Sequence, residues 1–488
     1  MSAENRQGAP DRFTLRKEYF GGLVLDSHTP KNEFLKPQEY EFLSRLKEAE
    51  GVFFDAVLES NPDLTQRVNA FAETGFVEKG PNGEIILTNI RLVPPPDQIR
   101  HGVLTAPIRV YDMYTRRCNL ACEHCYAASN PFIKEDRRTL EQTADIMKKF
   151  YDAGTIEWRF TGGEPTVYPD LFDAIDVAQG LGMNVSMNSN GWWSEKTAQK
   201  ILESGISEMV ISIEGEPGTN DLRRKVGSYN HVIDALDKVA HHNRFYSDKK
   251  IDVVINTAVG RDNINDAEFV VRLAAKYGHN VNFLPLKPSG RARHGLQSVM
   301  LSTREWMEFS RKVQQLRTDP EIQASGIKLT HRYKDLFCPT APDQSGKPYP
   351  FNYAECGATT TAISMFPDGR VFACPFVIEF DVRNEFVGPN MITSSVEEAW
   401  NHVNIDKFRT AEKTQGCTDC SHLSKRCRGA CKATVLGYGG EIKDGKLVGE
   451  DPYCYVSLID EEDTMIQESK ARGRQMLPFI QLDDIPTL

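Results

Sequence analysis

The stretch Cys118-Asn-Leu-Ala-Cys122-Glu-His-Cys125-Tyr126 sets three cysteines at spacings of four and three residues. Three thiolates in this pattern can converge on one soft metal centre, zinc or an iron-sulfur cluster, and leave a fourth position open. A structural zinc site would need a fourth protein ligand nearby, and we expect His124, which lies between two of the cysteines, to point elsewhere. We therefore expect the chemistry at the open position. A closed zinc site and unliganded core cysteines are the alternatives.

Length and composition describe an ordinary globular protein. The 488 residues suffice for about two to four domains, and the hydrophobic fraction of 40% is typical of such chains. The formal net charge of −10 provides no general basic field, so nucleic acid is a poor default partner. The N-terminus carries no apolar signal region, and no run of about 18 apolar residues occurs. We expect a cytoplasmic protein with no membrane partner.

The 11 cysteines fall into two groups, three near residue 120 and the other eight between residues 338 and 454. In a reducing compartment thiols are metal ligands more often than disulfides. Such segregation predicts separate metal sites.

Residues 1–100 predict a small winged-helix-like domain. Its expected elements are a strand pair at 12–26 with Gly21-Gly22 at a turn or bulge, helices at 37–46, 53–58 and 64–74, and a hairpin at 76–87 around Pro81-Asn82-Gly83. Pro94-Pro95-Pro96 follows as a stiff linker. The third helix contains one Arg and no Lys, which is weak for contacting phosphates. Peptide binding by strand addition is therefore preferred over a structural cap or nucleic-acid binding.

From residue 107 onward, strands and helices alternate. Strands are expected at 108–111, 156–160, 184–187, 209–213, 251–258 and 281–285, with helices at 139–153, 171–179, after Ser194, 229–241 and 267–277. Six such units predict an α/β fold, a partial (β/α)6 TIM-like barrel with its site at the carboxyl ends of the strands.

Polar turns follow several of these strands. They are Thr161-Gly162-Gly163-Glu164-Pro165, Asn188-Ser189-Asn190-Gly191 and Ser212-Ile213-Glu214-Gly215, with Asp221 and Arg224 close behind the last. The two glycines let a ligand approach the backbone, and the adjacent carboxylate can hold an ammonium group. Each alone is an ordinary turn, but their recurrence favours recognition of a polar ligand. The segment Lys287-Pro288-Ser289-Gly290-Arg291 is either a loop only or a basic contact near bound ligands.

These motifs together resemble the radical S-adenosylmethionine (SAM) superfamily over roughly residues 105–295. The resemblance implies a four-iron four-sulfur cluster on Cys118, Cys122 and Cys125, with SAM on the open iron. Reductive cleavage of SAM would give a 5'-deoxyadenosyl radical that abstracts hydrogen from the substrate. The residues implied to contact SAM are Tyr126, Gly162, Gly163, Glu164, Ser212 and Arg224. Many relatives carry Asp where this chain has Glu214.

The downstream cysteines surround a predicted hairpin, residues 362–373 with the turn Pro367-Asp368-Gly369. Eight thiols suit two four-thiolate clusters, with zinc ribbons as the alternative. The arrangement resembles the SPASM extension, a domain with two auxiliary clusters, although the interval from Cys420 to Cys427 is one residue longer than usual. By that resemblance the nearer cluster is held by Cys338, Cys356, Cys374 and Cys431, and the farther one by Cys417, Cys420, Cys427 and Cys454. If Cys338 is not a ligand, the nearer cluster has an open iron.

The first domain, with its segment at residues 16–24, resembles the leader-peptide recognition element of peptide maturases. The expected domains are 1–100 for leader recognition, 101–325 for the radical SAM partial barrel, 326–465 for SPASM and 466–488 for a tail. The leading hypothesis is a maturase that crosslinks or decarboxylates a ribosomally made precursor peptide, with flavodoxin or ferredoxin as reductant.

Three other hypotheses stay open. They are a dehydrogenase acting on a small molecule, an anaerobic sulfatase-type maturase, and a non-catalytic zinc or electron-transfer protein. The sulfatase type is disfavoured because relatives that oxidise a Ser or Cys carry an acid directly after the hairpin cysteine. In this chain Pro375 follows Cys374.

Overall fold

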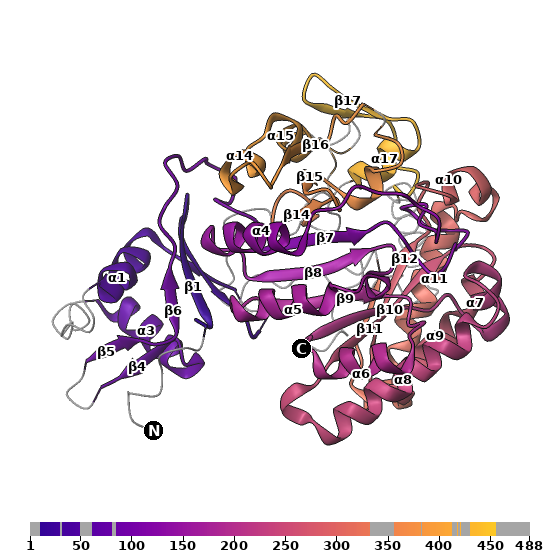
Figure 1. Cartoon of the computed structure of the whole chain (residues 1–488), viewed down its shortest axis with the longest axis horizontal. Coiled ribbons are helices and arrows are strands. Elements are labelled where there is room, and N and C mark those ends of the chain that lie inside the picture. The colour runs from indigo at the N-terminus through magenta and orange to yellow at the C-terminus, as the bar shows by residue number, and fades with distance from the viewer. Residues whose placement is uncertain are drawn as a thin grey trace, which may run out of the picture.

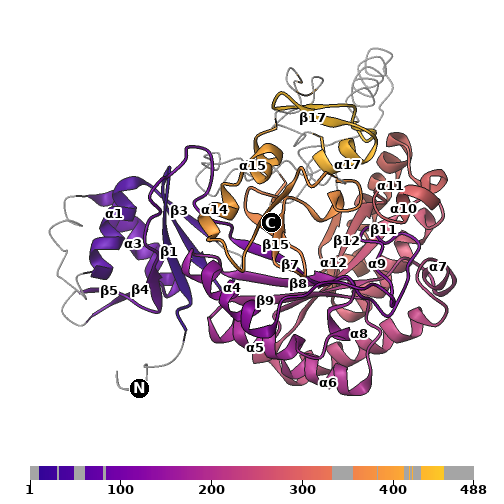
Figure 2. The ribbon, with the colours of Figure 1, turned by 45° about the horizontal axis from the view of Figure 1, so that its top comes forward.

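The computed structural model describes residues 10–29, 32–48, 61–80, 84–331, 356–381, 383–411, 417, 420 and 430–454. An N-terminal module lies beside a large α/β body, and the C-terminal segment covers one side of that body (Figures 1 and 2). None of the helices in the described ranges is both long and apolar enough to cross a membrane.

The N-terminal module contains the predicted elements that fall within the described residues. They are the antiparallel pair β1 (Phe13–Glu18) and β2 (Gly21–Asp26), helices α1 (Pro37–Glu48) and α3 (Pro62–Thr74), and the hairpin of β4 (Val77–Lys79) and β5 (Ile85–Leu87). Helix α3 ends at Gly75, whose φ of 78° is the left-handed conformation that glycine adopts without strain. The helix expected at 53–58 lies outside the described residues.

Two short strands of this module were not predicted. Strands β3 (Asn32–Leu35) and β6 (Ile90–Leu92) complete a four-stranded sheet in the order β3-β2-β1-β6. Each is only three or four residues long, which is too short for a period of two to be recognised. Strand β3 is therefore an edge strand of the module.

The central sheet confirms the predicted parallel α/β order. It runs β13-β12-β11-β10-β9-β8-β7-β14-β15-β16 and is open, so the barrel is partial. Its strands are β7 (Arg109–Thr115), β8 (Glu157–Gly162), β9 (Asn184–Ser189), β10 (Glu208–Ser212), β11 (Asp252–Val259), β12 (Asn280–Pro285), β13 (Leu329–His331), β14 (Ala362–Met365), β15 (Arg370–Phe372) and β16 (Val387–Asn390).

Helices cover the outer face of this sheet (Figure 1). They are α4 (Leu140–Asp152), α5 (Leu171–Gly180), α6 (Glu195–Glu203), α7 (Pro217–Arg223), α8 (Ser228–Phe245), α9 (Ala267–Tyr277), α10 (Ala292–Gly295), α11 (Thr303–Leu316) and α12 (Pro320–Ser325). Local sequence sets their starts: Thr139 and Gln142 form a capping box on α4, and the Ser194 side chain caps α6.

The C-terminal segment is not a detached domain. Its predicted hairpin, β14–β15, joins the central sheet because β14 pairs in parallel with β7. Trp400 and Phe408 belong to the same apolar core as Trp158 of β8. The remaining elements of the segment are α14 (Val396–Trp400), α15 (Val403–Thr410), α17 (Lys432–Gly437), β17 (Glu441–Lys443) and β18 (Lys446–Val448).

The N-terminal module is docked on the α/β body through a buried polar contact and an apolar cluster. Arg16 donates to Glu18 (Nε to Oε1, 2.7 Å), and Glu18 accepts the backbone amide of Thr105 at 2.8 Å. Leu23 and Leu25 of β2 pack against Leu104, Ile108 and Ile156 of the body. The module is thereby held in a defined position.

A buried ion pair joins the hairpin to the first strand of the central sheet. Arg138 donates to Asp112 (Nη2 to Oδ1, 2.6 Å), and both side chains are fully buried. Nη1 of Arg138 donates to the carbonyls of Phe366 and Pro367 at the hairpin turn, at 3.0 and 3.1 Å. The turn is thus fixed over β7.

We predict that Arg138→Met lowers the free energy of unfolding by about 3–5 kcal/mol, because it leaves the Asp112 carboxylate buried without its cation. Urea denaturation measures the loss. Lys148→Met, which removes the exposed pair with Asp152, is the control and is expected to change stability by less than about 0.5 kcal/mol. Equal effects of the two changes would contradict the prediction.

Candidate functional site

One cavity of about 740 Å³ lies between the inner face of the parallel sheet and the C-terminal segment. Both groups of cysteines reach it: Cys118, Cys122 and Cys125 from the loop after β7, and Cys356, Cys374 and Cys431 from the C-terminal segment. Its volume is within the range of small-molecule and cofactor sites. The tertiary structure therefore unites two metal-ligand motifs that the sequence separates by more than two hundred residues.

Cys118 is held by donors directed at its sulfur. The Leu120 amide lies 3.4 Å from Sγ and the Asn190 side-chain amide 3.6 Å from it. Burial raises the pKa of the Cys118 thiol to about 12. In a buried position, the negative charge of a thiolate is stable only if N–H donors and a nearby positive charge compensate it. A bound iron centre would supply that positive charge. The site thus fits an iron-sulfur cluster.

The two glycines at the end of β8 lie directly against the backbone that leads into the cysteine loop. A Cβ on Gly162 would lie 2.1 Å from the Thr115 carbonyl oxygen, and a Cβ on Gly163 would lie 2.1 Å from that of Arg117. The Gly163 amide donates to Thr115 at 2.7 Å. Both glycines line the cavity, and a side chain at either position would collide with this backbone. Their predicted contact with SAM stays a prediction.

Glu164 is fully buried behind the cavity wall. Its carboxylate accepts hydrogen bonds from the Ser189 hydroxyl at 3.0 Å and the Asn190 backbone amide at 2.7 Å. Burial raises the pKa of Glu164, and these donors act against that rise. Because Asn190 in turn contacts Cys118, Glu164 braces the cysteine loop. Its predicted contact with the SAM amino group stays a prediction.

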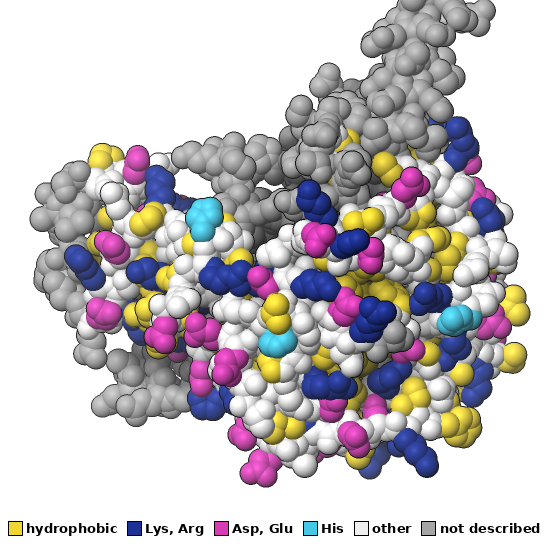
Figure 3. Space-filling model, turned by 90° about the horizontal axis from the view of Figure 1, so that it is seen from above, with side chains coloured by type: hydrophobic (Ala, Val, Ile, Leu, Met, Phe, Trp, Pro, Cys, Tyr) yellow, Lys and Arg dark blue, Asp and Glu magenta, His cyan; other side chains and the backbone are white. Residues whose placement is uncertain are grey.

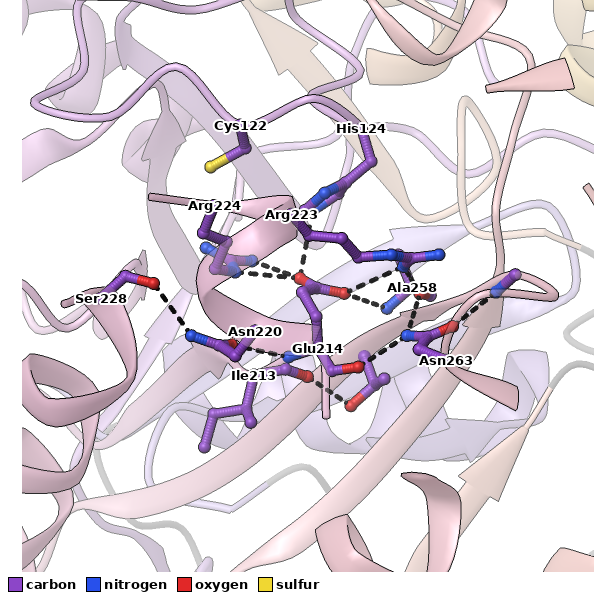
Figure 4. A network of polar contacts seen from close by, with 12 residues as sticks. Cys122, His124, Ile213, Glu214, Asn220, Arg223, Arg224, Ser228, Ala258 and Asn263 are labelled. Atoms are coloured by element: carbon purple, nitrogen blue, oxygen red, sulfur yellow. Dashed lines mark hydrogen bonds and ion pairs between the residues drawn. The ribbon is translucent and has the colours of Figure 1, made fainter. Parts of the chain in front are cut away.

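Glu214, at the end of β10, is the centre of a second network (Figure 4). Its Oε1 lies 3.1 Å from His124 Nε2 and 2.5 Å from Arg224 Nη2, and its Oε2 accepts the Ala258 amide at 3.0 Å. Burial alone would raise the pKa of Glu214, but His124, Arg224 and Arg223 hold it well below its usual range. The carboxylate is therefore ionised and ties the cysteine loop to β10, α7 and β11.

This network explains two features of the sequence. His124 points away from the cysteines and toward Glu214, as expected, and its buried Nδ1 has no hydrogen-bond partner among the described residues. The Glu at 214, where many relatives of the family have Asp, has the extra methylene with which one carboxylate contacts the loop and β11 together.

The segment after β12 also holds the cysteine loop, through hydrogen bonds to its backbone carbonyls. Arg291 donates to the carbonyls of Cys122 at 2.7 Å and Ser129 at 2.9 Å. Ser289 donates to the Tyr126 carbonyl at 3.2 Å and to that of Phe376 in the C-terminal segment at 2.9 Å. The sequence left this segment as a loop or a basic contact, and the structure places it between the two cysteine groups.

Three thiols of the second group, Cys356, Cys374 and Cys431, line the same cavity. Burial raises the pKa of Cys374 to about 12, and the neighbouring Cys356 and Cys431 contribute to the rise. Lys287 places its ammonium nitrogen 3.5 Å from Cys431 Sγ. The assignment of these three thiols as ligands of the nearer auxiliary cluster stays a prediction. Cys338, the fourth, lies outside the described residues.

The ligands of the farther cluster are only partly described. Cys417, Cys420 and Cys454 are not among the side chains lining the cavity, and the Cys420 amide donates to the Cys417 carbonyl at 3.2 Å. Cys427 lies outside the described residues. This ligand set stays a prediction.

The other residues assigned to SAM all line the cavity. Tyr126 packs on Phe376 with ring centroids 5.1 Å apart, Ser212 lies at the end of β10, and Arg224 is ion-paired with Glu214. Their contacts with SAM remain predictions. The structure adds a row that the sequence did not suggest, in which Ser212, Asn256, Asn282 and Thr330 stand in register on β10 to β13 and line the cavity.

Comparison with known families agrees with this geometry. Residues 113–274 match the radical SAM superfamily, and residues 356–421 match the SPASM iron-sulfur cluster-binding domain. The chain therefore carries a radical SAM domain followed by a SPASM domain, and it is an enzyme that uses SAM and four-iron four-sulfur clusters.

The chain is also similar to individual proteins that carry these domains. The chain is 28% identical to the mycofactocin maturase MftC of Mycolicibacterium smegmatis, over 75% of this chain and 88% of that protein. It is 25% identical to the AdoMet-dependent heme synthase of Nitratidesulfovibrio vulgaris, over 74% and 95%. The structure of Streptococcus suis SuiB bound to the precursor peptide SuiA has the same fold, with a TM-score of 0.64 at 14% identity over 87% of this chain and 95% of that one.

We predict that Glu214→Gln lowers both the iron content after anaerobic reconstitution and the free energy of unfolding, the latter by about 3–5 kcal/mol, since Arg224 loses its buried counter-charge. Glu214→Asp keeps the charge but is one methylene shorter, so an intermediate result is expected. Glu216→Gln, at an exposed neighbouring position, is the control. Wild-type iron content and stability in Glu214→Gln would refute the role given to this carboxylate.

Proposed function

We propose that this protein is a peptide maturase that modifies a ribosomally made precursor by radical chemistry, giving a crosslink or a decarboxylation. The observation that carries the proposal is the single cavity lined by both cysteine triads. A substrate side chain in that cavity lies between the centre that starts the reaction and a second iron-sulfur centre. The likeness to MftC, which its name describes as a maturase, supports a peptide as substrate.

The residues of the cavity have separable roles in this proposal. When bound on Cys118, Cys122 and Cys125, the cluster with SAM supplies a carbon radical that removes a hydrogen atom from the substrate. Glu164, Glu214 and Arg291 keep the loop of these cysteines in one position. Asn282, whose amide donates to Asn256 at 2.7 Å, and Thr330 offer hydrogen-bonding groups to a peptide backbone in the cavity.

Strand β3 is the proposed docking edge for the leader of the precursor. A Cβ on Gly21 would lie 2.2 Å from the Leu35 carbonyl oxygen, so that carbonyl faces β2. Since carbonyls alternate along a strand, the Phe34 carbonyl faces outward, and it accepts Arg67 Nη2 from α3 at 2.8 Å. Asn32, two residues earlier, presents its backbone amide on the same outward side, and this amide is the group we propose to pair with an added strand.

The remaining partner and location are part of the same proposal. A small reductant such as flavodoxin or ferredoxin supplies the electron for the first cluster. On the face shown in Figure 3, basic and acidic side chains are interspersed. A cytoplasmic location fits the proposed use of the cysteines as metal ligands, because thiols in a reducing compartment serve as metal ligands more often than they form disulfides.

A second candidate substrate is a small molecule. The similarity to the AdoMet-dependent heme synthases, which covers 95% of one such protein, favours it. In that case the N-terminal module is a structural cap, and changes at β3 leave activity intact.

The function is tested by anaerobic incubation with SAM, a reductant and the peptide encoded by a short reading frame beside the gene. We expect formation of 5'-deoxyadenosine and a change in the mass of the peptide, both abolished by Cys122→Ala. Absence of 5'-deoxyadenosine with the wild-type enzyme would refute radical SAM activity. Its formation with an unchanged peptide would favour the small-molecule substrate.

Leader docking is tested by Asn32→Pro. The amide of Asn32 points the same way as the Phe34 carbonyl, outward from the sheet, so its loss spares the pairing with β2. We expect unchanged thermal stability and at least about tenfold weaker binding of the precursor, measured by fluorescence anisotropy. A tenfold change in affinity corresponds to about 1.4 kcal/mol, which is about the contribution of one hydrogen bond. Glu33→Pro, whose amide faces β2, is expected to destabilise the module instead. Unweakened binding by Asn32→Pro would exclude this edge.

A further inference from the structure

Lys287 occupies a distinctive place in the cavity. It follows β12, and its ammonium nitrogen lies 3.5 Å from Cys431 Sγ and 4.0 Å from the centroid of the Phe376 ring. Cys431 is one of the downstream thiols that line the cavity with Cys356 and Cys374. The cation therefore sits directly at the second cysteine group, with an aromatic ring covering it.

The other cations of the cavity have their charges satisfied by different groups. Arg109 pairs with Glu157, Arg159 with Glu208 and Arg224 with Glu214. Lys432 donates to two backbone carbonyls, those of Phe408 at 2.6 Å and Arg409 at 2.8 Å. Lys287 makes no ion pair with any carboxylate among the described residues. The polar contact of its ammonium group is with the sulfur of Cys431.

The position of Lys287 is fixed by the chain on either side of it. The Leu286 amide donates to the Val259 carbonyl at 2.9 Å, and the Leu286 carbonyl accepts the Tyr453 hydroxyl at 3.1 Å. Gly437 packs so closely on Pro288 that a Cβ there would lie 2.9 Å from the proline ring. The backbone from which Lys287 reaches the thiols is thus fixed by neighbours from both the barrel and the C-terminal segment.

We propose that Lys287 is a positioning residue that raises the reduction potential of the auxiliary cluster held by Cys356, Cys374 and Cys431. The inference rests on the proposed function only in taking these cysteines as cluster ligands. A cluster gains negative charge on reduction, so a fixed positive charge beside a ligand sulfur stabilises the reduced form more than the oxidised form.

The test is a redox titration of the reconstituted full-length protein followed by electron paramagnetic resonance. The background is Cys118→Ala/Cys122→Ala/Cys125→Ala, so that the iron-sulfur signals arise from the downstream cysteines alone. Lys287→Met removes the charge at similar length, Lys287→Gln keeps a polar group, and Lys287→Arg keeps the charge. Lys225→Met, which removes a lysine over Trp192 beside the first cysteine loop, is the matched control.

In Lys287→Met and Lys287→Gln, we expect the reduced-to-oxidised ratio of one auxiliary cluster, measured at its wild-type midpoint, to fall about tenfold, or about 59 mV for a one-electron couple. Lys287→Arg should restore most of the potential, and Lys225→Met should leave it unchanged. An unchanged midpoint in both Lys287→Met and Lys287→Gln would overturn the proposal and leave Lys287 as an anion contact for substrate.

The titration contains no peptide, so failure of the enzyme to modify a peptide does not affect it. Absence of any auxiliary signal in the triple-cysteine background would overturn the ligand assignment, and the role of Lys287 with it.

Discussion

The arrangement of the site depends on one buried carboxylate, that of Glu214. It is fully enclosed, and burying a charge is tolerated only when it is paired and hydrogen-bonded. Here the partners come from three places, His124 in the cysteine loop, Arg224 after α7, and the Ala258 amide on β11. The loop that carries the three predicted metal ligands is thereby attached at a defined point to the carboxyl ends of strands β10 and β11. Glu164, acting through Asn190, attaches the same loop at Cys118.

The second cysteine group reaches the same cavity because the C-terminal hairpin is part of the central sheet. Strand β14 pairs with β7, and Arg138 fixes the hairpin turn by contacting Asp112 and two turn carbonyls. This continuity places Cys374 at the end of β15, beside the segment that follows β12. Lys287 and Ser289 of that segment touch the C-terminal side, and Arg291 touches the first loop. In the proposed function, a substrate in this cavity therefore lies between the two groups of cysteines.

Much of the fold could be predicted from local patterns. The alternation of strands and helices from residue 107, the hairpin at β14–β15, the helix beginning at Pro37 and the helix expected at 64–74 follow from periodicity and turn residues, and they are confirmed. Strands β3, β6, β13, β16, β17 and β18 were missed because three or four residues carry no recognisable period. Gly162 and Gly163 were recognised from the sequence as a place of close approach, and their predicted contact with SAM stays a prediction. A glycine requirement is visible in sequence, but whether a ligand or another backbone makes the close approach is set by the loop packed against it.

The sequence by itself determined which atoms this protein brings to its chemistry. Cysteine spacing and the polar turns at strand ends are local properties, and they identified the radical SAM and SPASM domains and their cofactors. Only the tertiary structure decided which of those groups meet. That Glu164 and Glu214 brace the cysteine loop, and that Lys287 lies at Cys431, depends on contacts between segments far apart in the chain. Such contacts are selected by burial and charge compensation, which act in three dimensions and leave no fixed spacing in the sequence.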